Sequence, residues 1–351
     1  MAMVYYRKFA VHRTPHCMWD REMDERESEF VSYFDPDYLA FVADVFSQLL
    51  KDEIELHAAM ALRTYYSHAL ETLFALLCAF IQAPDCISGW FLTYRPTELR
   101  DLVQDIQEKR EVLTKLDLDP VTWLSLSKLI NSIATDDGEM LAEAQQRFAS
   151  LWARLASDFL DEARVGEFNS IKHGLRVKSG GFDIGFCPRD PAGGPDLKRV
   201  YKPMSGSKYG SSFFQRERLP SKHHFRVLKR AVNWDPASLA QDIRLAALSM
   251  HNILACLRVI KGADPASEQI RIPGPEYFDC HIPKSGSIVT CVTADVPVPH
   301  KELPKFTSEQ ILAVYEEPRW RVAGSSDEAP EANSTACPED VGEEGSSGGA
   351  S

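Results

Sequence analysis

The feature that most constrains the fold is a long apolar segment from Ile54 to Gln82. After Leu70 it carries apolar residues at almost every position, so a helix formed from it would have no polar face to turn toward solvent. Such a helix is stable only when other elements surround it, and Pro84 marks its end. The segment therefore predicts the central helix of a bundle.

Amphipathic segments that would surround this helix lie on both sides of it in the chain. Asp35-Pro36 has the form of a helix start, and the apolar residues that follow recur at three- and four-residue spacing. The same spacing predicts helices over 96–110, 119–133 and 138–165. We therefore expect a mainly α-helical fold built on an N-terminal helical bundle.

The pattern changes at Gly174, where a smaller α+β portion begins. Alternating residues around Ser179-Gly180-Gly181 predict a β-hairpin, and the Gly- and Pro-rich residues 188–222 predict a long loop. A strand is expected over 224–232, and one long helix over 236–260, where Asp235-Pro236 supplies the start.

These patterns divide the chain into five parts. From Arg321 onward the residues are mostly small, acidic or Pro and show no periodicity, which is typical of a disordered segment. The predicted parts are an irregular N-terminal arm (1–30), the helical bundle (31–173), the basic β-containing portion (174–304), a C-terminal extension (305–320) and a disordered acidic tail (321–351).

The net charge of −12 is unevenly distributed. Residues 164–232 hold fifteen Lys and Arg against five acids, a net charge of +10, whereas residues 321–351 have a net charge of −6. Aromatic residues lie among these cations, which suits stacking on single-stranded nucleic acid and equally suits ordinary strand packing. The residues that we expect to contact nucleic acid are Lys178, Lys198, Arg199, Lys202, Lys208, Arg216 and Arg218.

Neither a signal peptide nor a membrane span is predicted. The first thirty residues mix charges of both signs, and the most apolar run, Ala69–Ile81, is too short to cross a bilayer. The eight cysteines form no C-x-x-C pair and are expected to be reduced thiols. We therefore expect a cytoplasmic protein without a membrane partner. No cofactor or metal is expected, since His12, His16 and Cys17 make an incomplete zinc ligand set.

The strongest candidate site lies between Asn169 and Arg176. If the preceding helix continues to His173, Asn169 and His173 lie one turn apart, and Lys172, His173 and Arg176 gather where the helix dipole favours cations. Asn169, Lys172, His173 and Arg176 are the primary candidates for catalysis. The alternative is that all four merely complete a helix end.

A secondary cluster, Arg63, His68 and Glu71, belongs to the central helix. Ionisable groups buried in an apolar helix must be paired, and His68 and Glu71 are one turn apart. We therefore predict a buried structural network. The alternative is a site in which Glu71 orients His68 as a general base beside His173.

Together these clusters resemble HEPN-type helical domains. The resemblance rests on Arg63-Thr-Tyr-Tyr-Ser-His68 and on the later Asn169-x-x-Lys172-His173-Gly174. In that family an R-x(4–6)-H motif near the end of a late helix forms an endoribonuclease site across a dimer interface, commonly in defence or toxin–antitoxin systems. Here Phe168 stands five residues before His173, where the family has its arginine.

The resemblance implies a protein that acts on or binds RNA and that could form a homodimer. It would be either a metal-independent RNase or an RNA-binding relative. In an RNase, His173 would act as general acid or base, and Lys172 and Arg176 would stabilise the phosphorane charge. The alternative is a non-enzymatic interaction protein whose basic segment docks an acidic partner or the chain's own tail.

Overall fold

The computed structural model describes residues 6–132, 134, 137–186, 202–220, 224–279, 291–294 and 299–315. The chain is mainly α-helical, as predicted, with a smaller set of antiparallel strands. It divides into two compact units, Met1–Pro297 and Val298–Ser351, which are described separately.

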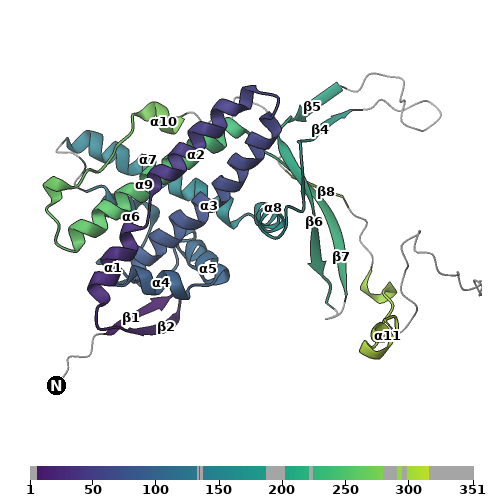
Figure 1. Cartoon of the computed structure of the whole chain (residues 1–351), viewed down its shortest axis with the longest axis horizontal. Helices are drawn as coiled ribbons and strands as arrows, with labels where there is room; N and C mark the ends of the chain where they lie inside the picture. The colour runs from purple at the N-terminus through teal and green to yellow at the C-terminus, as the bar shows by residue number, and fades with distance from the viewer. Residues whose placement is uncertain are drawn as a thin grey trace, which may run out of the picture. The chain divides into compact units, whose positions relative to one another are not determined.

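The helices of the first unit pack around one central helix, as the apolar segment predicts (Figure 1). Their bounds are α1 (Met23–Ser32), α2 (Pro36–Gln48), α3 (Glu55–Gln82), α4 (Ile87–Thr93), α5 (Pro96–Gln107), α6 (Trp123–Ile130), α7 (Gly138–Leu160), α8 (Glu162–Lys172), α9 (Pro236–Ile260) and α10 (Pro275–Asp279). Short 3-10 turns lie at Leu49–Lys51 and Pro265–Ser267. In α3 every residue from Leu73 to Gln82 is buried, because α2, α5, α7 and α9 all contact it.

The Asp-Pro helix starts at Asp35 and Asp235 are confirmed, whereas the helix predicted from residue 119 begins at Trp123, with Thr122 as its cap. The Asp35 carboxylate accepts from the Tyr38 amide at 3.3 Å, and that of Asp235 accepts from the Ser238 amide at 2.8 Å. The helix that begins after Asp235, α9, lies beyond Gly174 in the chain, yet it packs along α2 and α3 (Figure 1). The bundle is therefore completed by a segment that we assigned to the basic portion.

The N-terminal residues differ from the predicted irregular arm. They form an antiparallel hairpin of β1 (Tyr6–Val11) and β2 (Thr14–Trp19), followed by α1. Phe9 and Val11 alternate with more exposed residues and are buried against the bundle, which is the half-buried pattern of a strand. The hairpin turns at His12, whose φ is 54°. Glycine or asparagine usually occupies such a position, so the turn lacks the residue types that mark a hairpin in a sequence.

Gln82, at the end of α3, fastens this hairpin to the bundle. Its buried amide Nε2 donates to the carbonyl oxygens of His12 (2.9 Å) and Leu113 (3.0 Å). Its Oε1 accepts from the His12 amide at 2.7 Å and from Trp90 Nε1 at 3.3 Å. One side chain thus satisfies polar groups from three separate segments.

The predicted continuation of α7 through residue 165 is wrong. α7 ends at Leu160, and Asp161, with ψ of 120°, caps a new helix, α8, by accepting from the Arg164 amide at 2.9 Å. The break lets α8 leave the direction of α7 (Figure 1). The candidates Asn169 and Lys172 therefore belong to a short separate helix, and His173 is its C-cap.

A four-stranded antiparallel sheet lies against α8 (Figure 1). Its order is β3 (Val177–Ser179), β6 (Gly210–Arg218), β7 (Phe225–Asn233) and β8 (Cys291–Ala294). The sheet comes close to Gly166 of α8, where a Cβ atom would lie 3.2 Å from the buried ring of Phe213 and 2.8 Å from the end of the Gln215 side chain. Ala163, Phe213 and Val232 form the small apolar cluster where α8 and the sheet meet.

Strand pairing also differs from the predicted hairpin. β3 pairs with β6, and β4 (Asp183–Phe186) pairs with β5 (Lys202–Gly206), so the strands on either side of Gly180 are not partners. Asn233 sets this arrangement because its side chain exchanges two hydrogen bonds with the backbone of Phe182, at 2.8 and 2.9 Å. β5 and β6 both lie within the predicted loop of 188–222, so that prediction is wrong for these residues; residues 188–201 lie outside the described residues.

Two described helices, α3 and α9, are long and apolar enough to cross a membrane by length and composition. In each, 67% of the most apolar window is buried inside the protein. Both are core helices of the bundle.

The second unit is described over residues 299–315. It contains a 3-10 turn at His300–Glu302 and α11 (Ser308–Ala313), which Thr307 caps by accepting from the Gln310 amide at 3.2 Å. The predicted acidic tail, 321–351, lies outside the described residues.

We predict that Gln82→Leu destabilises the protein by about 3 kcal/mol, since each buried group left without a partner costs roughly 1–3 kcal/mol. Leucine has a similar volume but leaves the His12 and Leu113 backbone groups unsatisfied. Urea unfolding followed by circular dichroism measures the change. Gln104→Leu, at an exposed position of α5, is the matched control and should stay within about 0.5 kcal/mol of wild type. Equal stability of the two variants would contradict this account.

Candidate functional site

A buried ion pair joins the bundle to the sheet through α8. The Arg63 guanidinium of α3 donates to Glu167 Oε2 from Nε at 2.8 Å and from Nη2 at 2.6 Å. Glu167 Oε1 accepts from Ser211 Oγ of β6 at 2.5 Å and from Trp234 Nε1 at 3.0 Å. Arg63 is 2% exposed and Glu167 is fully buried, so both charges depend on these partners.

Burial alone would lower the pKa of Arg63, but the charge and hydrogen bonds of Glu167 outweigh it and raise that pKa. Arg63 is therefore a charged structural group. We predicted a buried network of Arg63, His68 and Glu71. The burial of Arg63 is confirmed, but its partner is Glu167 of α8 and not a residue of its own helix.

His68 and Glu71 do not form the predicted pair. His68 is exposed and Glu71 half-buried, so neither is forced to seek a partner within the helix, and no ion pair joins them in the described structure. The His68 ring packs edge-on against Phe168 of α8, with ring centroids 5.1 Å apart. Partial burial lowers the pKa of His68, Glu71 opposes that shift, and Lys172 adds to it, so all three groups share one region.

The four primary candidates lie at the C-terminal end of α8, and the structure separates them. Asn169 and Lys172 line a pocket, whereas His173 and Arg176 are exposed outside its lining. His173 is the C-cap residue, and its amide donates to the Asn169 carbonyl at 3.1 Å. The helical spacing of Asn169 and His173 is therefore confirmed, but the imidazole does not join the amide in the pocket.

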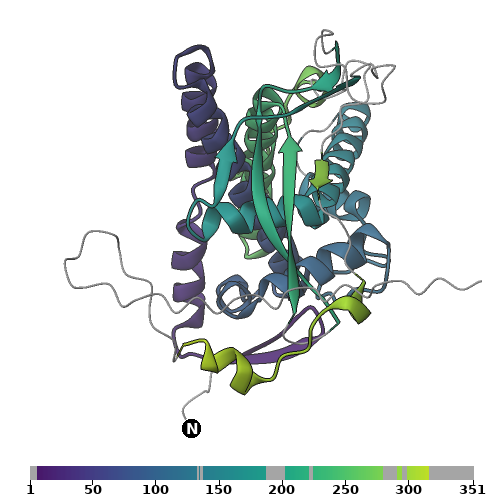
Figure 2. The same ribbon diagram turned by 90° about the vertical axis from the view of Figure 1, so that its right-hand side faces the viewer.

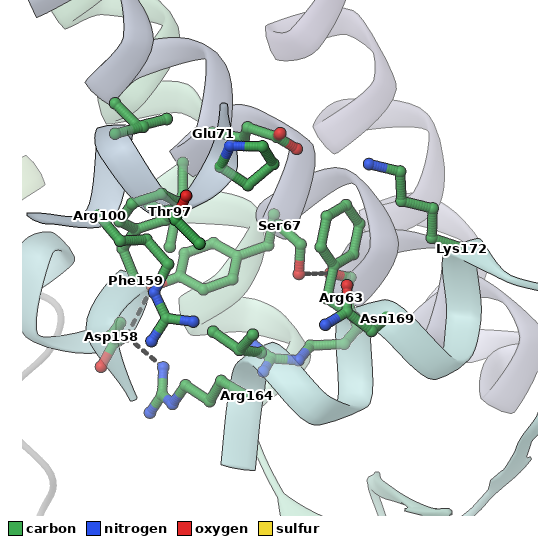
Figure 3. Close-up of a pocket in the computed structure, with 16 residues that line it drawn as sticks. Arg63, Ser67, Glu71, Thr97, Arg100, Asp158, Phe159, Arg164, Asn169 and Lys172 are labelled. Atoms are coloured by element: carbon green, nitrogen blue, oxygen red, sulfur yellow. Dashed lines mark hydrogen bonds and ion pairs between the residues drawn. The ribbon is translucent and has the colours of Figure 1, made fainter. Parts of the chain in front are cut away.

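The pocket lies between α3, α5, α7 and α8 and has a volume of about 260 Å³ (Figure 3). Six apolar residues and the apolar parts of the polar side chains make its wall mostly apolar; the six are Leu70, Pro96, Leu99, Phe159, Val165 and Phe168. Polar groups line the rest: Arg63, Tyr66, Ser67, Glu71, Thr97, Arg100, Asp158, Arg164, Asn169 and Lys172. Sequence reasoning missed Arg100, Thr97 and Asp158 as part of this site, because α5 and α7 meet α8 only in the folded chain.

Several charges of the pocket are already neutralised by neighbours. Asp158 accepts from the Tyr66 hydroxyl at 2.6 Å and pairs with Arg164 (Figure 3). Burial, together with the negative charge of Asp158, raises the pKa of Tyr66 well above its usual value, so this phenol stays protonated. It acts as a hydrogen-bond donor to Asp158 rather than as a proton acceptor.

A second candidate surface is the side of the four-stranded sheet that faces away from α8 (Figure 2). Register places Phe214 opposite Lys229, Arg216 opposite Val227 and Arg218 opposite Phe225. All six are exposed, with Phe214 at 68% and Phe225 at 55%. Lys178 of β3 lies opposite Ser212 on the same side. We call these seven residues the outer sheet face: Lys178, Phe214, Arg216, Arg218, Phe225, Val227 and Lys229.

The outer sheet face is basic and aromatic. Four of its seven residues are cations, and the described strands place no acid on this side. The Arg216 guanidinium lies over the Phe225 ring at 5.6 Å from its centroid. On the opposite side Glu217 pairs with Arg226, so the two sides of the same strands differ in charge balance.

The residues predicted to bind nucleic acid do not lie on one surface. Lys178, Arg216 and Arg218 lie on the outer sheet face, which also contains Lys229. Lys208 instead pairs with Glu55 at the start of α3. Lys202 belongs to β5, and Lys198 and Arg199 lie outside the described residues. Phe214, Arg216 and Arg218 occupy every second position of one strand, and this pattern could have identified the face from the sequence.

Within the described residues no group of three or more His, Cys, Asp or Glu side chains is placed to hold a metal ion. His12, one of the sequence candidates for zinc, bonds through Nε2 to Asp105 at 3.0 Å. Comparisons with family models, with curated proteins and with solved structures find no match to this chain. The pocket and the outer sheet face are therefore the features of this chain that bear on its function.

We predict that Arg63→Met and Glu167→Gln each destabilise the protein by about 3–5 kcal/mol, because each leaves one buried charged or polar group without its partner. The double variant should be less destabilised than the sum of the two. A coupling of about 1–3 kcal/mol, from a double-mutant cycle in urea, is expected for groups in direct contact. Glu167→Gln retains the oxygen that accepts from Ser211 and Trp234. Strictly additive effects would contradict a direct energetic pairing.

Proposed function

We propose that this protein binds single-stranded RNA on its outer sheet face. The observation that carries the proposal is the pairing of exposed Phe214 and Phe225 with exposed cations on adjacent strands. Exposed aromatic rings on a sheet stack on unpaired bases, and neighbouring cations neutralise the phosphates that connect them. The resemblance of the helical segments to HEPN-type domains favours RNA as the nucleic acid.

Electrostatics supports the same partner. The protein as a whole is acidic, with a net charge of −12, so general attraction to polyanions is not expected. Attraction has to come from a local surface where cations outnumber acids. The outer sheet face is such a surface, since its four cations lie on strands that place no acid on that side in the described structure.

Binding is better supported than cleavage. Cleavage through the 2′-hydroxyl needs an acid and a base that converge on one phosphate. His173 and His68 both lie outside the lining of the pocket, and Arg63 is neutralised by Glu167. The exposed position of His173 between Lys172 and Arg176 suits contact with a phosphate without requiring proton transfer.

The competing proposal is an acidic protein segment, including the chain's own tail, docked on the same cations. Such a partner would depend on charge alone, whereas stacked bases depend on the two rings as well. The aromatic side chains therefore distinguish the two partners.

We predict that the double variant Phe214→Ala/Phe225→Ala binds single-stranded RNA at least about tenfold more weakly, since stacking contributes roughly 1–3 kcal/mol per base. Fluorescence anisotropy with a short labelled RNA of mixed sequence measures the affinity. Both rings are exposed, so the melting temperature should change little. Phe41→Ala, at a 62% exposed position of α2, is the matched control and should bind like wild type. Unchanged affinity of the double variant would show that Phe214 and Phe225 do not stack on RNA bases.

We predict that Arg216→Gln and Arg218→Gln each reduce the dependence of RNA binding on salt. The slope of log affinity against log salt should become shallower by about 0.7 for each phosphate of a single strand that the variant no longer neutralises. Lys208→Gln, outside the outer sheet face, should leave the slope unchanged. Electrophoresis of the same samples checks the RNA, which should stay intact; cleavage that disappears in His173→Ala would instead support an RNase.

A further inference from the structure

The pocket between α3, α5, α7 and α8 is separate from the outer sheet face and has a chemistry of its own. Four cations and two acids line it. Arg63 is neutralised by Glu167, and Arg164 by Asp158. Lys172 and Arg100 remain without a carboxylate partner in the described structure, against the single carboxylate of Glu71.

Lys172 and Asn169 place two free donors at the α8 side of the pocket (Figure 3). They are three residues apart and therefore lie on the same side of the helix. The Lys172 ammonium lies over the Phe168 ring at 5.8 Å from its centroid, and the Asn169 side chain makes no hydrogen bond to another described residue. An ammonium and an amide on one side of a helix can both donate to one carboxylate or phosphate group.

The remaining wall is apolar and aromatic. Leu70 and Leu99 are buried, and the half-buried rings of Phe159 and Phe168 complete the lining. A flat apolar body would replace water against these side chains, and rings stack favourably with rings. The pocket therefore offers an anionic and an apolar subsite together.

Volume limits the size of the occupant. An apolar cavity of about 150 Å³ accommodates benzene. The pocket, at about 260 Å³, has room for one ring and one substituent and lies just below the usual range for larger ligands. A dinucleotide or a similarly large cofactor would not fit inside it as a whole.

We propose that this pocket binds a small aromatic anion, one ring that bears a single carboxylate or phosphate group. The anionic group is held by Lys172 and Asn169, and the ring lies against Phe159 and Phe168. Glu71 opposes the anion and restricts it to the α8 side of the pocket. This site is independent of RNA binding on the outer sheet face, so either proposal can fail alone.

Isothermal titration calorimetry of the full chain tests the proposal with three probes. Phenylacetate and phenyl phosphate supply the two anionic groups, and phenylacetamide is the neutral isostere of the first. Either anion should bind saturably and at least about tenfold more tightly than the amide, the usual scale of one charge-assisted hydrogen bond. Tighter binding of phenyl phosphate assigns a phosphate ligand, and tighter binding of phenylacetate assigns a carboxylate.

Three variants test the geometry. Lys172→Met should weaken binding of the anion about tenfold and leave phenylacetamide unaffected. Arg176→Met removes a cation four residues away, outside the pocket lining, and should leave the affinity for both probes unchanged. Glu71→Gln should strengthen anion binding several-fold because it removes the opposing charge.

The proposal is overturned if neither anion binds saturably at millimolar concentration, or if anion and amide bind equally. It is also overturned if Arg176→Met weakens binding of the anion as much as Lys172→Met does. Lys172 and Arg176 are both exposed, so their replacements should keep the wild-type melting temperature, which is measured on the same samples.

Discussion

The burial of Arg63 and Glu167 constrains the rest of the structure. Two ionised groups withdrawn from water must find each other, because an unpaired charge in the interior is far more costly than an unsatisfied neutral group. Glu167 satisfies this demand with donors from α3, from β6 and from the residue after β7. These donors converge only when α8 lies between the bundle and the sheet. The ion pair thus specifies one placement of α8, whatever its net contribution to stability.

That placement gives α8 two different neighbours. Gly166 and Ala163 lie against the sheet, where small residues let β6 approach closely. Phe168, Asn169 and Lys172 face the pocket instead. A helix of only three turns therefore supports both candidate surfaces. Asp161 makes this possible because it ends α7 and caps α8, whereas a continuous helix would have kept the direction of α7.

The sequence predicted what depends on local patterns. The apolar segment after Leu70 and the two Asp-Pro starts led correctly to a mainly α-helical bundle, since helix periodicity and caps act within a few residues. It did not predict which elements meet. The partner of Arg63 is 104 residues away, and the pocket residues Arg100 and Asp158 come from two further helices. The hairpin around His12 was missed because its turn has no glycine or asparagine, and because Gln82, which bonds the turn, lies 70 residues away.

The candidate surfaces differ in how their charges are balanced, and this difference bears on function more than the motif at His173 does. Elsewhere on the described surface some cations have a carboxylate beside them, as Arg226 has in Glu217 and Lys208 has in Glu55. On the outer sheet face, Arg216 has an aromatic neighbour instead, beside rings that remain in water. Phe214 and Phe225 stay exposed among these cations, which is the arrangement on which the proposal of RNA binding rests. The pocket keeps only two cations unmatched around an apolar wall, which suits a single small anion.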